Sequence, residues 1–130
     1  MSSAKTKTQK KIDNHIREAL TRVCDRALDR VDGFQWLTHQ ADFTNFPASL
    51  LVTCVFEQEQ QRQQAEQNGD CQWLQKQCQA ELLKVGVKFK SLPQQVRFDS
   101  EEACNEQQQG DWQLRLLRLQ GRAVVKNRPH

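Results

Sequence analysis

The spacing of apolar residues changes twice in the first half of this chain, and this change constrains the fold more than any other feature. Between residues 9 and 31, apolar side chains recur every three or four positions, over about six turns of an amphipathic helix. After Gly33, residues 34–43 alternate between apolar and polar side chains, and residues 50–57 are apolar on both faces. This order predicts a long helix followed by a β-hairpin.

The second half of the chain contains a further helix and a third strand. Apolar residues at helical spacing return from Cys71 to Val85, and Asp70 is well placed as the N-cap of this helix. Residues 87–90 and 95–99 are short strand candidates on either side of Pro93. The 130 residues therefore predict one small α+β domain with the order helix–strand–strand–helix–strand, followed by a short C-terminal helix.

Polar segments predict where this domain ends. Residues 1–9 and 120–130 are expected to be flexible basic arms on either side of a domain that covers residues 10–119. Inside the domain, residues 57–70 are rich in Gln, and only Ala65 in this segment can contribute to a core. We expect a mobile loop or a solvated helical extension here, which folding does not require.

The stretch VRFDSEEAC, residues 96–104, places three carboxylates and a thiol close together. Such a cluster suits either acid/base or metal chemistry, or the first turn of a helix. Glu102 lies three residues after Asp99, which is the spacing of a capping box with Asp as the N-cap, and no His is near in the sequence. The stretch therefore predicts a helix start without a chemical role.

Other residues with catalytic or metal-binding chemistry are scattered along the chain. Two alternatives depend on folding to assemble them: a metal site made of His15, His39 and a Cys, and a nucleophile pair of His39 with Cys54. The five Gly form no phosphate-binding loop, and the five Cys contain no C-x-x-C pair and are typical of buried, reduced thiols. We predict no catalytic, cofactor-binding or metal-binding residue, and no enzymatic activity.

Two further features predict the compartment. The longest apolar run, residues 49–56, is shorter than the roughly 20 residues that cross a membrane. The basic N-terminus is not followed by the apolar region of a secretory signal. We therefore expect a cytoplasmic protein without membrane contact.

Positive charge is concentrated in a few places, although the net charge is only +3. Three arginines repeat every four residues on the polar face of the first predicted helix, where Asp25 and Asp29 lie close enough to offset their repulsion. This stripe is either a solvated face or a contact surface for phosphates. The candidate nucleic-acid-binding residues are Lys10, Lys11, Arg22, Arg26, Arg30, Lys88, Lys90 and Arg97.

Two resemblances bear on the function. The predicted order of helices and strands resembles the KH-like domain of the ribosome-binding factor A family, which implies binding to RNA or the ribosome. The strings KKIDNHIREALTRVCDRAL, GFQWLTH, FPASLLVTCVF, RFDSEEAC and GDWQLRL resemble a family of small bacterial proteins. Members of that family often carry the label of Fis-type transcriptional regulator, which implies a regulatory role on DNA.

These observations predict a binding protein without enzymatic activity. Its expected partner is a nucleic acid or the ribosome, which it would contact through the basic helix face and the basic arms. The alternative is a protein-interaction module with an acidic partner, or a homodimer that uses the face of the hairpin around Trp36.

Overall fold

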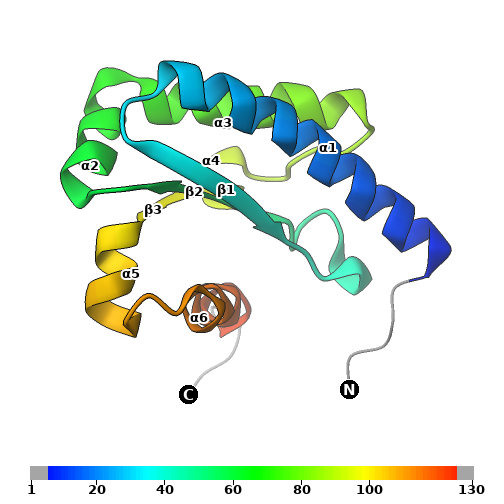
Figure 1. Cartoon of the computed structure of the whole chain (residues 1–130). Coiled ribbons are helices and arrows are strands. Elements are labelled where there is room, and N and C mark those ends of the chain that lie inside the picture. The colour runs from blue at the N-terminus through cyan, green and yellow to red at the C-terminus, as the bar shows by residue number, and fades with distance from the viewer. Residues whose placement is uncertain (1–5, 126–130) are drawn as a thin grey trace.

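A three-stranded sheet lies at the centre of residues 6–125, the part of the chain that this computed structural model describes (Figure 1). The central strand is β2 (Leu51–Phe56), which is buried along its whole length. It pairs antiparallel with β1 (Phe34–Gln40) and parallel with β3 (Val96–Ser100). The predicted hairpin and the predicted third strand are therefore confirmed.

Helices cover both faces of this sheet, as Figure 1 shows. The chain is a single small α+β domain, as the sequence predicts, with helices interspersed between the strands. One face is covered by α1 (Lys7–Arg30) and α3 (Asp70–Lys84), and the other by α5 (Glu101–Gln108) and α6 (Trp112–Val125). The remaining helices are η1 (Phe43–Asn45), α2 (Glu59–Asn68) and α4 (Leu92–Gln95).

Helix α1 begins at Lys7 because Thr6 caps it. Thr6 Oγ1 accepts a hydrogen bond from Gln9 N at 3.1 Å, and Gln9 Oε1 accepts one from Thr6 N at 3.0 Å, so the two residues form a capping box. The apolar face of the helix is buried in the same core as Val52, Cys54 and Phe56 of β2 and the inner face of α3. This burial fixes α1 and α3 side by side above the sheet.

The Gln-rich segment is an ordered helix in the structure. Helix α2 covers residues 59–68, Ala65 is 2% exposed, and Arg62 pairs with Glu59 at 2.9 Å and with Glu66 at 2.6 Å. Of the two sequence-based alternatives, the structure has the helix and not the mobile loop. The segment then turns directly into α3 at Gly69, whose φ of 93° suits glycine. Gly69, not Asp70, occupies the N-cap position of α3, so the predicted cap is wrong.

Residues 87–90 form no strand, which corrects the sequence prediction. Val87 and Phe89 are buried, as the alternation suggests, but Val87 N donates to the Leu82 carbonyl and Lys90 N to the Gln95 side chain, and neither donates to a neighbouring strand. Gln95 Oε1 accepts from the N–H groups of Lys90 and Ser91, both at 2.8 Å, and Gln95 Nε2 donates to the Pro47 and Leu50 carbonyls at 2.8 Å. One buried Gln therefore joins the end of this segment to the loop before β2, where no strand pairing does so.

Asp99 does not cap a helix, so the predicted capping box is also wrong. The N-cap of α5 is Ser100, whose Oγ accepts from Ala103 N at 3.0 Å. Asp99 remains in β3, and its carboxylate binds the Arg115 guanidinium at 2.6 and 2.8 Å. Glu102 Oε1 accepts from Glu59 N, which joins the starts of α2 and α5. The stretch therefore contains a helix start, but the Asp99 carboxylate binds α6 through Arg115 and does not cap α5.

The C-terminal region contains two helices where the sequence predicts one short helix. The rings of Trp36 in β1 and Trp112 in α6 pack edge to face, with 4.8 Å between the ring centres. The Glu101 carboxylate accepts a hydrogen bond from each of the two indole N–H groups at 2.7 Å. Helix α6 continues to Val125, so the predicted flexible tail at 120–130 begins within a helix. Residues 1–5 and 126–130, which belong to the predicted basic arms, lie outside the described part of the chain.

Candidate functional site

The three predicted arginines of α1 lie in a row against α3. The two helices run antiparallel, and both place a residue at the contact every four positions. We call this row the α1–α3 seam. Its contacts are Arg22 with Glu81, Arg26 with Gln77 and Glu81, and Arg30 with Trp73.

A buried carboxylate organises the middle of the seam. Glu81 is 1% exposed, and its two oxygens bind Arg22 Nε at 2.9 Å, Arg26 Nη1 at 2.8 Å and Lys84 Nζ at 3.1 Å. The hydrogen bond from Arg22, followed by that from Lys84, lowers the pKa of Glu81 to about 2. Glu81 is therefore ionised at neutral pH and holds three cationic groups around one point.

These cationic groups remain open to solvent, unlike the carboxylate. The side chains of Arg22, Arg26 and Lys84 are 46%, 45% and 65% exposed. Three positive groups around one negative group leave a local charge of +2 on the surface of the seam. The guanidinium of Arg30 lies 4.3 Å from the centre of the Trp73 ring, a cation–π contact that extends the seam toward the end of α1.

The other predicted binding residues are not part of the seam. Lys10 and Lys11 are exposed on the first half of α1, and Lys88 and Lys90 are exposed on the segment that follows α3. Arg97 is exposed on β3, where it lines a separate hollow of about 410 Å³ with Gln75 and Phe98 among its neighbours. The structure thus brings together Arg22, Arg26 and Arg30, and leaves the remaining five candidates on other surfaces.

Sequence reasoning missed Glu81 and Lys84. A signal for Glu81 existed, because it lies three residues after Cys78 and seven after Leu74, and so falls on the apolar face of the second predicted helix. A charged residue on a buried face needs a partner of opposite charge. The sequence predicts that Asp25 and Asp29 offset the repulsion between the arginines. In the structure, Glu81 of α3 forms the ion pairs with Arg22 and Arg26.

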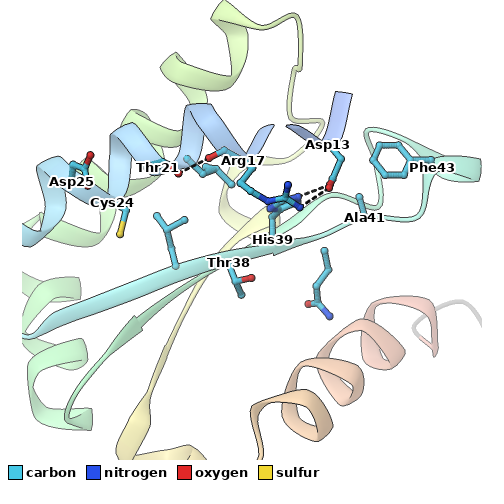
Figure 2. A pocket seen from close by; sticks show the side chains of 12 residues that line it. Asp13, Arg17, Thr21, Cys24, Asp25, Thr38, His39, Ala41 and Phe43 are labelled. Carbon is cyan, nitrogen blue, oxygen red and sulfur yellow. Dashed lines mark hydrogen bonds and ion pairs between the residues drawn. The ribbon is translucent and has the colours of Figure 1, made fainter. Parts of the chain in front are cut away.

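A second candidate site is the cleft between α1 and β1, with a volume of about 560 Å³ (Figure 2). In its wall, His39 Nε2 lies 2.7 Å from Asp13 Oδ1, and Arg17 Nη2 donates to Asp13 Oδ2 at 3.0 Å. Asp13 is 7% exposed, so it anchors a histidine and an arginine in the way that Glu81 anchors the seam cations.

The alternative metal and nucleophile sites do not assemble in this cleft. His39 faces Asp13, and the strand register places Leu37, not His39, opposite Cys54. Among residues 6–119, no group of three or more His, Cys, Asp or Glu side chains is close enough to hold a metal ion. Cys54 has a raised pKa through its hydrogen bond with Cys78 and its burial, so its thiol stays protonated at neutral pH.

No helix in the described part of the chain is long and apolar enough to cross a membrane. Comparisons with known proteins do not identify the chain: no protein-family model, no curated protein and no solved structure matches it.

Proposed function

We propose that this chain binds nucleic acid through the phosphate backbone, and that the α1–α3 seam is the contact surface. The observation that carries this proposal is the cluster of Arg22, Arg26 and Lys84 around the buried Glu81. A guanidinium matches the geometry of a phosphate group, and the carboxylate fixes both guanidinium groups before any ligand arrives. Binding therefore costs less side-chain entropy than binding by free arginines.

The dimensions of the seam agree with such a ligand. Arg22 to Arg30 spans eight helical steps, which is about 12 Å at 1.5 Å per residue. A nucleic-acid strand advances about 3.4 Å per nucleotide in a duplex, so the seam covers about three to four nucleotides. Lys10, Lys11, Lys88, Lys90 and Arg97 remain candidates for further phosphate contacts.

The exposed seam cations are donors that suit phosphate contacts, which carry no sequence information, so we expect binding to RNA and DNA with little sequence preference. The sequence contains no GXXG tetrapeptide, with which KH domains clamp a nucleic-acid backbone. The proposal therefore depends on the seam and not on the KH-like order of elements. A ribosomal RNA surface fits this mode of binding.

The test compares the binding of fluorescein-labelled RNA and DNA by matched variants. The seam variant combines Arg22→Gln, Arg26→Gln and Glu81→Gln, so that no buried charge is left without partners. The control variant Arg118→Gln changes the net charge by the same single unit at an exposed position on α6. We plot the logarithm of the association constant K against the logarithm of the salt concentration. We expect the slope of this plot to become about two units less steep in the seam variant, because two phosphate contacts are lost. The control should retain the slope.

A third variant, with Arg22→Lys and Arg26→Lys, keeps the charge and loses the guanidinium geometry. We expect weaker binding with a nearly unchanged slope. If the seam variant and the Arg118→Gln control lose affinity equally, the seam is not the contact surface. If no variant binds nucleic acid at low salt, the partner is more consistent with the alternative, a protein.

A further inference from the structure

The three tryptophans of the chain occupy two different environments. Trp36 and Trp112 pack against each other, and Glu101 accepts a hydrogen bond from each of their indole N–H groups. These contacts cover the face around Trp36 that the sequence suggests for a homodimer. Trp73 lies instead at the α1–α3 seam, where it packs partly against the hydrophobic core and holds the Arg30 guanidinium 4.3 Å from the centre of its ring.

The residues of α3 that contact the arginines change in character along the seam. Arg22 and Arg26 bind the Glu81 carboxylate through their N–H groups. Arg30 instead contacts the ring of Trp73. A carboxylate binds a guanidinium through the N–H groups at its edge, whereas a cation–π contact does not use those groups. The seam therefore holds charged donors at its middle and an arginine on an aromatic ring at one end.

Arg30 can present a flat face to a ligand at this end of the seam. The residue is exposed, although its guanidinium rests on the Trp73 ring. Guanidinium groups are planar, and nucleic-acid bases stack on them as they stack on aromatic side chains. The ring also holds Arg30 in place before any ligand arrives, which lowers the side-chain entropy that binding costs.

The spacing along the seam allows a phosphate and a nearby base to bind together. Arg26 and Arg30 are four residues apart, about 6 Å along the axis of α1. Nucleotides in a stacked strand are about 3.4 Å apart, so this distance covers about two nucleotides. A strand whose phosphate contacts Arg26 therefore carries a base within reach of Arg30. In a duplex, each base is paired and shows only its edges in the grooves, so only an unpaired base can stack on Arg30.

We propose that the ligand of the α1–α3 seam is single-stranded nucleic acid, and that Arg30 on the Trp73 ring stacks one unpaired base. This inference rests on the proposed function, which places phosphates at Arg22 and Arg26. Stacking tolerates any sequence because every base has a flat face, so binding keeps its low sequence preference. Figure 1 shows α1 and α3 as the outer layer on their side of the sheet, where a strand can lie along both helices.

The test measures binding of three fluorescein-labelled DNA probes of equal length by anisotropy at low salt. The probes are an oligo-thymidine strand, an abasic strand with the same backbone, and a duplex of oligo-thymidine with oligo-adenosine. The two single strands carry the same phosphate charge and differ only in their bases. We expect the wild type to bind oligo-thymidine about tenfold more tightly than the abasic strand, because one base stacks on Arg30.

Substitutions at the seam assign this difference to Arg30. Arg30→Lys keeps the charge and removes the planar group, so it should remove most of the tenfold difference and leave binding of the abasic strand and the duplex nearly unchanged. The matched control Arg118→Lys makes the same exchange at an exposed position on α6 and should keep the difference. Trp73→Leu should reduce the difference, because it removes the ring under Arg30, whereas Trp73→Phe should keep most of it. Circular dichroism checks that each variant is folded.

The outcomes separate this inference from the proposed function. Equal binding of oligo-thymidine and the abasic strand by the wild type overturns the stacking of a base and leaves the phosphate contacts standing. An Arg30→Lys variant that keeps the tenfold difference also overturns it. Absence of binding to all three probes overturns the proposed function and this inference together.

Discussion

Replacing Asp99 with Ala is expected to lower the free energy of unfolding by about 3–5 kcal/mol. The Asp99 carboxylate binds the Arg115 guanidinium twice, and both side chains are nearly buried, at 10% and 14% exposed. Without Asp99, the remaining hydrogen-bond partners of the Arg115 guanidinium are neutral: the side chains of Gln107 and Gln108 and the Ala103 carbonyl. Because Arg115 belongs to α6, this loss should also loosen α6 from the sheet.

Two further substitutions, Asp99→Asn and Ser100→Ala, distinguish the contribution of this ion pair from that of a helix cap. Asp99→Asn should recover only a minor part of the stability, because an amide carries no charge to pair with Arg115. Ser100→Ala, which removes the actual cap of α5 and the hydrogen bond from Ser100 Oγ to Glu59, should cost less, about 1–3 kcal/mol. Urea unfolding measures both values, and the change in Trp fluorescence that is lost when Trp112 is replaced by Phe reports the detachment of α6. An Asp99→Asn variant as stable as the wild type would contradict the ion-pair account.

The second large effect concerns Glu81. Arg22→Gln together with Arg26→Gln leaves the buried carboxylate with Lys84 as its remaining cationic partner, and we expect a loss of about 3 kcal/mol. Adding Glu81→Gln to this double variant should restore most of the stability, because the buried charge is then gone. Urea unfolding at neutral pH measures both steps. A triple variant less stable than the double variant would show that Glu81 stabilises the fold by other contacts.

The pH dependence of stability follows from the same carboxylate. Its pKa is lowered from 4.5 to about 2 by the hydrogen bonds from Arg22 and Lys84, so its contribution is complete above pH 4.5 and is lost as the pH falls toward 2. The wild type should therefore lose more stability than the triple variant between these two pH values. Equal losses in the two proteins would mean that Glu81 does not gain stability from its cationic neighbours.

The parts of the fold that the sequence predicts are those set by apolar periodicity. The long helix, the hairpin and the helix from residue 71 are correct because their buried faces repeat over many residues, as Ile16, Leu20 and Val23 do in α1. The errors occur where a single polar side chain decides the structure. Gln95 replaces the strand expected at 87–90, and Arg115 draws Asp99 away from a capping role.

The candidate site was predictable only in part, for the same reason. The spacing of Arg22, Arg26 and Arg30 is visible in the sequence, but their pairing with Glu81 depends on the antiparallel packing of α1 and α3. This contact joins residues 59 positions apart in the case of Arg22, which no local pattern can show. The cleft that joins Asp13 to His39 likewise depends on how α1 crosses β1.

The salt dependence of nucleic-acid binding by the wild-type chain tests the central claim most directly. Fluorescence anisotropy with a labelled single-stranded RNA and a labelled DNA duplex, at several salt concentrations, gives the slope of log K against log salt. Phosphate contacts by the seam cations, with Lys10 and Lys11 of α1 as candidates for further contacts, predict a slope of about −3 to −5, similar for unrelated sequences. A slope near zero, or no binding at the lowest salt concentration, would contradict the claim that this chain binds nucleic acid through its cationic seam.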